Sequence, residues 1–237
     1  PPRSTPFPND ALPISLETLL GAAPFENWTK DVCSMVLDES YKFTCEVTGP
    51  LNAVGDREGC RLEDGKVITP TGFKEAWKRQ CEAGWKALSS DPEYDGQGAP
   101  SMLTCAVEEF LCGSNPAFNM YGGLAHGAAE VIAHFGTKRQ RGLFVRNMLH
   151  GVWGGTMCLT EPHAGSDVGS ARTSAKRLGD GKYAISGTKI FISAGDQDFT
   201  DNVVHLVLAR VDGAPPGTKG LSLFIVPKVR VNEDGTL

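Results

Sequence analysis

The sequence lacks the spacings by which several common sites are recognised. Its seven cysteines include no C-x-x-C pair, and the chain contains no P-loop, no H-E-x-x-H and no G-x-S-x-G motif. These absences argue against a structural zinc site, a P-loop nucleotide hydrolase and an α/β-hydrolase. We therefore expect no bound metal, and we interpret the dispersed cysteines as reduced, cytosolic thiols.

Strong charge and long apolar runs are also missing. The net charge is only -5, and no apolar run approaches the ~20 residues that a membrane-spanning helix needs. No secretory signal pattern opens the chain. The composition, 41% hydrophobic and 22% charged, is typical of globular domains. We predict no nucleic-acid partner, no transmembrane segment and a bacterial cytoplasmic location.

Both ends of the sequence read differently from the rest. Residues 1–13 hold five prolines and show no periodicity, and proline at that density blocks helix and ladder hydrogen bonds. We expect residues 1 to about 16 to be non-native and residues 1–25 to form a disordered or non-native leader. The last residues follow a turn signal without a closing helix, so we expect a fragment cut at both ends.

Hydrophobic periodicity predicts helices first and strands afterwards. Spacings of three and four predict five helices, at 26–48, 72–83, 101–112, 115–136 and 137–151. Thr71 is the expected N-cap of the second helix, and Thr137 is that of the fifth. Residues 49–66 read as a loop. Alternation with period two predicts strands at 152–160, 171–178, 183–187, 188–193, 203–211 and 220–227, with a tight hairpin at 179–182. This order predicts an α+β chain: an all-α domain over 26–151, then an antiparallel, β-barrel-like domain over 152–237.

The stretch MCLTEPHAGSD, residues 157–167, ends the first strand in a polar turn. Thr160 offers a hydroxyl, and Gly165 and Ser166 offer accessible backbone N–H groups, which can bind a heteroaromatic edge and an anion. A turn that merely caps the strand explains the pattern equally well. His163, Ser166 and Asp167 are too close in one turn to face each other as a hydrolytic triad. We interpret Glu161 as a solvated or capping carboxylate.

The stretch GTKIFISAG, residues 187–195, places Phe191 and Ser193 on one face of the predicted strand. A ring and a hydroxyl two residues apart suit a planar cofactor, because one can stack and the other can donate. A core phenylalanine beside an exposed serine is the simpler explanation of this stretch taken alone.

The two motifs together closely resemble the acyl-CoA dehydrogenase family. LTEPHAGSD is followed about thirty residues later by GTKIFIS, and upstream stretches such as GWKALSSDPEYDGQGAP resemble that family's N-terminal helical domain. The resemblance covers roughly residues 26–237. PLNAVGDREGC and the segment from KIFISAGDQ onward resemble the large bacterial subgroup that includes methylthiopropanoyl-CoA dehydrogenase. Asp95 departs from the pattern, because it stands where the family commonly has a glycine.

The resemblance implies an FAD-dependent enzyme that converts an acyl-CoA to the trans-2-enoyl-CoA and passes electrons to electron-transfer flavoprotein, working as a homo-oligomer. By position, the residues implied to bind FAD are Met157, Leu159, Thr160, Gly165, Ser166, Phe191, Ile192 and Ser193, with Ser166 also near the CoA moiety. The acyl group is implied to be methylthiopropanoyl or a medium-to-long fatty chain.

The resemblance also implies that this chain holds no catalytic residue. The family's base is a glutamate of the C-terminal helical domain, which we expect beyond Leu237; Glu161 is not in the base position. The missing C-terminal domain implies that the 237 residues alone are inactive. A non-catalytic subunit that binds flavin or acyl-CoA, or an acyl-CoA oxidase on the same fold, fits the same sequence.

Overall fold

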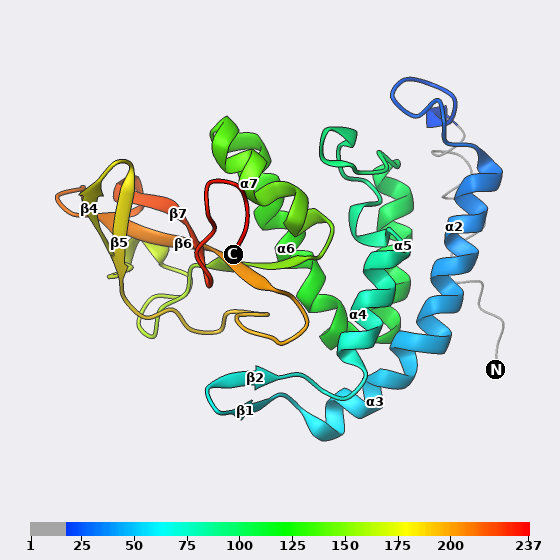
Figure 1. The fold of residues 1–237 in the computed structure, drawn as a ribbon, viewed down its shortest axis with the longest axis horizontal. Helices are drawn as coiled ribbons and strands as arrows, with labels where there is room; N and C mark the ends of the chain where they lie inside the picture. The colour runs from blue at the N-terminus through cyan, green and yellow to red at the C-terminus, as the bar shows by residue number, and fades with distance from the viewer. Residues whose placement is uncertain (1–17) are drawn as a thin grey trace. The chain divides into compact units, whose positions relative to one another are not determined.

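The computed structural model describes residues 18–237, so the first part of the expected leader, residues 1–17, lies outside the described residues (Figure 1). Contacts divide the chain into two compact units. The helical unit extends to Arg61 and continues over Thr69–Asn119, and the sheet unit comprises Leu62–Ile68 and Met120–Leu237. Between residues 18 and 237, no helix is both long enough and apolar enough to cross a membrane.

The helical unit opens on a longer helical run than the sequence predicted. Helix α2 (Lys30–Phe43) is capped by Thr29, continues through a π-helical turn over Thr44–Thr48, and leads into α3 (Gly49–Glu58). The predicted loop at 49–66 is therefore wrong. Proline in a first helical turn removes no hydrogen bond, so the proline after Gly49 does not break the helix. Strands β1 (Arg61–Glu63) and β2 (Lys66–Ile68) then form a two-stranded sheet.

Helices α4 (Phe73–Glu82) and α5 (Ser101–Ser114) complete the helical unit, as predicted. Phe73 is fully buried, and its ring meets that of Phe118 edge to face at 5.4 Å. Thr71 is not the cap of α4: Gly72 is, and the Thr71 N–H donates to Glu58 instead, at 2.8 Å. Between α4 and α5, Asp95 adopts a φ of 61°, so this position keeps a left-handed conformation although it is not a glycine.

Two helices pack on the first strand of the five-stranded sheet. Helix α6 (Pro116–Phe135) crosses from one unit into the other, and α7 (Lys138–Leu149) begins with the predicted Thr137 cap as a complete capping box with Gln140. Strand β3 (Trp153–Cys158) carries Gly155 where the helices approach. A Cβ on Gly155 would lie only 2.8 Å from the Ala125 Cα and 2.7 Å from the Met148 Cε, so the close packing requires glycine.

The remaining strands are β4 (Ser174–Gly179), β5 (Lys182–Ser186), β6 (Asn202–Val211) and β7 (Leu221–Pro227), in the order β3-β6-β4-β5 with β7 also on β6 (Figure 1). The α+β class is confirmed. The pairs β4–β5 and β6–β7 are antiparallel as expected, but β3–β6 and β4–β6 are parallel. The parallel pairs arise because long irregular segments, not hairpins, lead from β3 to β4 and from β5 to β6.

Local geometry explains one correct and one incorrect strand prediction. Asp180 and Gly181 both have positive φ, at 50° and 71°, so the β4–β5 hairpin closes in the predicted tight turn. By contrast, residues 188–193 form no strand: Phe191 and Ala194 have φ of 56° and 55°, which interrupts extended backbone. Phe191 and Ser193 therefore do not share a strand face.

Candidate functional site

The two sequence motifs lie side by side in the sheet unit. The Ile190 N–H donates to the Thr160 carbonyl at 3.0 Å, and the Lys189 Nζ donates to the Leu159 carbonyl at 2.9 Å. Segments thirty residues apart are thus joined by a main-chain and a side-chain hydrogen bond. The structure brings the predicted site residues of both motifs into one region at the end of β3.

The first motif closes into a turn with an accessible backbone. Glu161 and Ala164 exchange two main-chain hydrogen bonds, at 2.9 and 3.0 Å. Gly165 and Ser166 follow on the exposed side of this turn. A Cβ added at Gly165 would meet only the Thr160 Cγ2, at 3.9 Å, so the space beside this backbone is open. A ligand can therefore approach the main chain closely here.

The second motif presents an aromatic ring to solvent. Phe191 is 89% exposed, whereas Ile192 and Ser193 are half-buried. The φ of Phe191 is positive, in a region of backbone conformation that bulky residues seldom occupy. Such conformations persist where the surrounding structure enforces them, and they cluster at ligand sites. The exposed ring is a ready surface for stacking on a planar group.

Glu161 is neither solvated nor a simple cap, which corrects the sequence interpretation. Its side chain is 3% exposed and accepts hydrogen bonds from the Arg172 N–H at 2.7 Å, the Thr173 N–H at 3.0 Å and the Lys189 Nζ at 2.8 Å. Burial opposes ionisation, but these donors outweigh it and lower the pKa of Glu161 to about 2. A carboxylate so weakly basic and so enclosed is unsuited to proton abstraction.

Sequence reasoning missed Lys189. Its side chain is only 9% exposed, and it pairs with Glu161 between the two motifs. Lysine is almost never fully buried unless it is paired, so its position in a polar–apolar alternation gave no signal of this role.

A cleft of about 910 Å³ adjoins the first motif. Arg210 on β6 braces its walls by donating to the Gly169 carbonyl at 2.8 Å, to the Gly217 carbonyl at 3.0 Å and to the Pro215 carbonyl. The other side chains that line it are mainly polar or charged, among them His163, Asp167, Ser170, Arg172 and Thr218. Ser166, predicted to lie near a CoA moiety, falls between His163 and Asp167 in the sequence and is not itself part of the lining. Arginine, imidazole and hydroxyl groups suit a ligand with anionic groups.

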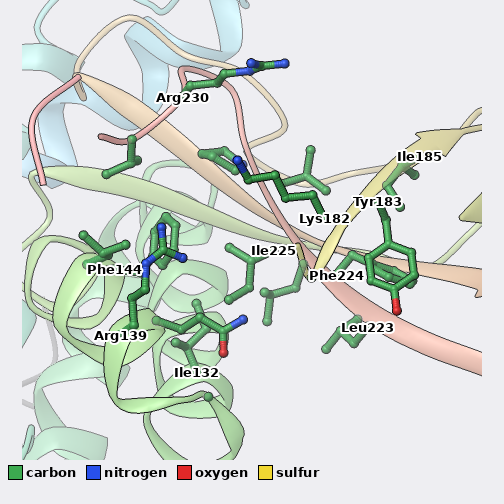
Figure 2. Close-up of a pocket in the computed structure, with 18 of the residues that line it drawn as sticks. Ile132, Arg139, Phe144, Lys182, Tyr183, Ile185, Leu223, Phe224, Ile225 and Arg230 are labelled. Atoms are coloured by element: carbon green, nitrogen blue, oxygen red, sulfur yellow. The ribbon is translucent and has the colours of Figure 1, made fainter. Parts of the chain in front are cut away.

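A second cleft, of about 950 Å³, is mainly apolar and lies between α6 and α7 on one side and β5 and β7 on the other. Figure 2 shows Ile132 and Phe144 on the helices facing Ile225 and other side chains on the strands. It contains none of the predicted site residues, so we do not place the site there. Among residues 18–237, no cluster of three or more His, Cys, Asp or Glu side chains could hold a metal ion.

Comparison with known proteins identifies two family domains in tandem. Residues 38–152 match the N-terminal domain of acyl-CoA dehydrogenases, and residues 156–235 match the middle domain.

Two similar curated proteins are bacterial. The 3-methylmercaptopropionyl-CoA dehydrogenase of Ruegeria pomeroyi is 42% identical over 86% of this chain and 35% of that protein. The broad-specificity linear acyl-CoA dehydrogenase FadE5 of Mycobacterium tuberculosis is 47% identical over 91% of this chain and 35% of that protein. The chain therefore spans about a third of the length of these relatives.

A similar solved structure, described as the electron transferring flavoprotein of Acidaminococcus fermentans, has a TM-score of 0.69 and 27% identity. The match covers 85% of this chain and 49% of that one. Together, the two adjoining domain matches and the bacterial relatives show that the chain belongs to the acyl-CoA dehydrogenase family.

Proposed function

We propose that this chain contributes the FAD- and acyl-CoA-binding part of an enzyme that oxidises an acyl-CoA to the trans-2-enoyl-CoA and passes electrons to an electron-transfer flavoprotein. The observation that carries the proposal is the junction of the two motifs, where Ile190 and Lys189 bond to the carbonyls of Thr160 and Leu159. The family supplies the reaction class, and the junction supplies a place for the cofactor.

The residues at the junction fit a flavin dinucleotide. Thr160 offers its hydroxyl, and Met157 and Leu159 offer backbone groups, to the polar edge of the ring system. The open backbone at Gly165 and Ser166 suits the pyrophosphate, since unencumbered N–H groups bind anions. The bound flavin would supply the oxidising power, which no side chain of the protein can provide.

The second motif would cover the same cofactor. The Phe191 ring is exposed and free to stack on a flat ring system, and Ile192 and the Ser193 hydroxyl follow in the same loop. The backbone conformation of Phe191 turns its ring outward instead of into the core. These contacts would orient the cofactor and exclude water from one of its faces.

The cleft braced by Arg210 would take the phosphate-bearing part of the CoA thioester. His163 and Arg172 line this cleft, and Ser166 is adjacent in sequence to Asp167, which also lines it. The named relatives act on 3-methylmercaptopropionyl-CoA and on linear acyl-CoAs, and we propose the same substrate class. We assign the base to a glutamate outside these 237 residues, because Glu161 is enclosed and weakly basic.

A pair of phenylalanine variants tests the cofactor site. Phe191→Ala should weaken FAD binding about tenfold, because ring stacking contributes about 0.5–1.5 kcal/mol beyond buried area. Phe135→Ala is the matched control, since this ring is 86% exposed at the end of α6 and lines the apolar cleft, which contains none of the predicted site residues. Titration by quenching of FAD fluorescence measures both. Absence of FAD binding by the wild-type protein, or equal losses in both variants, would refute the proposed site.

A further inference from the structure

A buried ion pair ties together the segments that meet at the junction. The Lys189 Nζ bonds the Leu159 carbonyl at 2.9 Å and the Glu161 Oε1 at 2.8 Å. Glu161 in turn holds the N–H groups of Arg172 and Thr173, just before β4 begins. The pair thus joins the first motif, the entry to β4 and the second motif. Each of these segments is irregular backbone with few ladder hydrogen bonds of its own.

The lysine also fixes the direction of a peptide group. In a trans peptide the carbonyl and the following N–H point to opposite sides. Because Lys189 draws the Leu159 carbonyl toward the buried side, the Thr160 N–H is directed away from the lysine. A backbone group of Leu159 and the Thr160 hydroxyl are assigned above to the polar edge of the flavin. Because this peptide group joins the two residues, a change in its orientation would move both of these groups.

The second motif needs such an anchor because its loop is strained. Phe191 and Ala194 have φ of 56° and 55°, and a left-handed conformation is unfavourable for residues with a Cβ. Lys189 lies two residues before Phe191, with its side chain buried and paired. Buried ion pairs often add little net stability because desolvation offsets their attraction. Their geometric demand is high, which suits a role in placement.

We propose that Lys189 is a positioning residue that sets the spacing and peptide orientation of the two flavin-binding segments through Leu159 and Glu161. The inference rests on the proposed function, because it concerns the same cofactor. In this proposal, neither Lys189 nor Glu161 contacts the flavin itself. The pair fixes the position of Thr160 relative to the loop that carries Phe191 before the cofactor binds.

The decisive variant is Glu161→Gln/Lys189→Met, because it removes both charges at once. Lys189→Met alone leaves a buried, uncompensated carboxylate and can fail to fold. Lys176→Met is the matched control, since Lys176 is an exposed lysine on β4 of the same unit. Each purified protein is stripped of FAD, and its thermal unfolding, its FAD dissociation constant and the visible spectrum of bound flavin are measured.

We expect the double variant to unfold within a few degrees of the wild-type apoprotein but to bind FAD about tenfold more weakly, with an altered flavin spectrum. Lys189→Arg, which keeps a cation near both oxygens, should recover part of the affinity, and Lys176→Met should match the wild type. If the double variant bound FAD as tightly as the wild type, the inference would be overturned and the proposed function would stand. Loss of the folded apoprotein in the double variant would show a purely structural pair and would also overturn it. Failure of the wild-type protein to bind FAD would refute the proposed function together with the inference.

Discussion

Acidification should destabilise the sheet unit through Glu161. The pKa of this buried carboxylate falls from 4.5 to about 2, since hydrogen bonds from Lys189 and from residues 172 and 173 outweigh the cost of burial. A carboxylate whose folded pKa lies below its unfolded value stabilises the fold above the unfolded pKa and loses that contribution as pH falls through the folded one. The shift corresponds to about 3 kcal/mol at neutral pH. Of this, about 1 kcal/mol is lost by pH 4 and about 2 kcal/mol by pH 3.

Urea unfolding of the wild type and Glu161→Gln at pH 7, 5 and 4 measures this contribution, followed by tryptophan fluorescence, to which Trp153 on β3 contributes the signal of the sheet unit. We expect the free energies of unfolding to differ by about 3 kcal/mol at pH 7 and by about 1 kcal/mol less at pH 4. Glu233→Gln is the matched control: Glu233 pairs with Arg139 in the same unit, but its side chain is exposed. Its effect should be much smaller. A difference for Glu161→Gln that is equal at pH 7 and pH 4 would refute the reasoning.

Three further predictions follow from packing and capping. Thr137→Ala should lower the free energy of unfolding by about 1 kcal/mol, measured by urea denaturation, because α7 loses its capping box. Gly155→Ala should destabilise the sheet unit by about 1–3 kcal/mol in the same assay, since the new Cβ would press on the backbone of Ala125. In the native protein, exposed Cys105 should react with a maleimide well before buried Cys33, and equal rates would contradict the burial described.

The parts of the fold that the sequence predicted well depend on local chemistry. The α7 cap needs only Thr137 and Gln140, three residues apart, and the β4–β5 turn needs only Asp180 and Gly181. Each signal lies within four residues, and here no distant contact overrules it, unlike the equally local Thr71 cap, which gives way to a hydrogen bond with Glu58. The resemblance also grouped the predicted site residues into two motifs, and the structure brings these motifs side by side. Their assigned contacts with FAD stay predictions.

The errors occurred where distant contacts or helix context decide the backbone. The glycines and aspartates of residues 49–66 predicted a loop, yet after the π-helical turn Gly49 and the proline after it begin α3, where proline is acceptable. The parallel pairing of β3 and β4 with β6 depends on where two long irregular segments lead the chain. Composition reveals that such segments exist, but their course is set by contacts with partners far away in the sequence.

Residues 188–193 show how an alternating pattern can mislead in an informative way. The alternation predicted a strand with Phe191 and Ser193 on one face, and a core phenylalanine was the simpler explanation. The structure forms no strand there, buries Lys189 and exposes Phe191. Both placements oppose the usual preference of these residue types for surface and core. Lys189 is buried because Glu161 and the Leu159 carbonyl satisfy it, and Phe191 turns outward with a positive φ. A buried lysine and an exposed phenylalanine do not help a hydrophobic core. In a cofactor site they would give a rigid backbone and a solvent-exposed aromatic ring. The failure of the strand prediction at this loop therefore supports the proposal that the loop binds the cofactor.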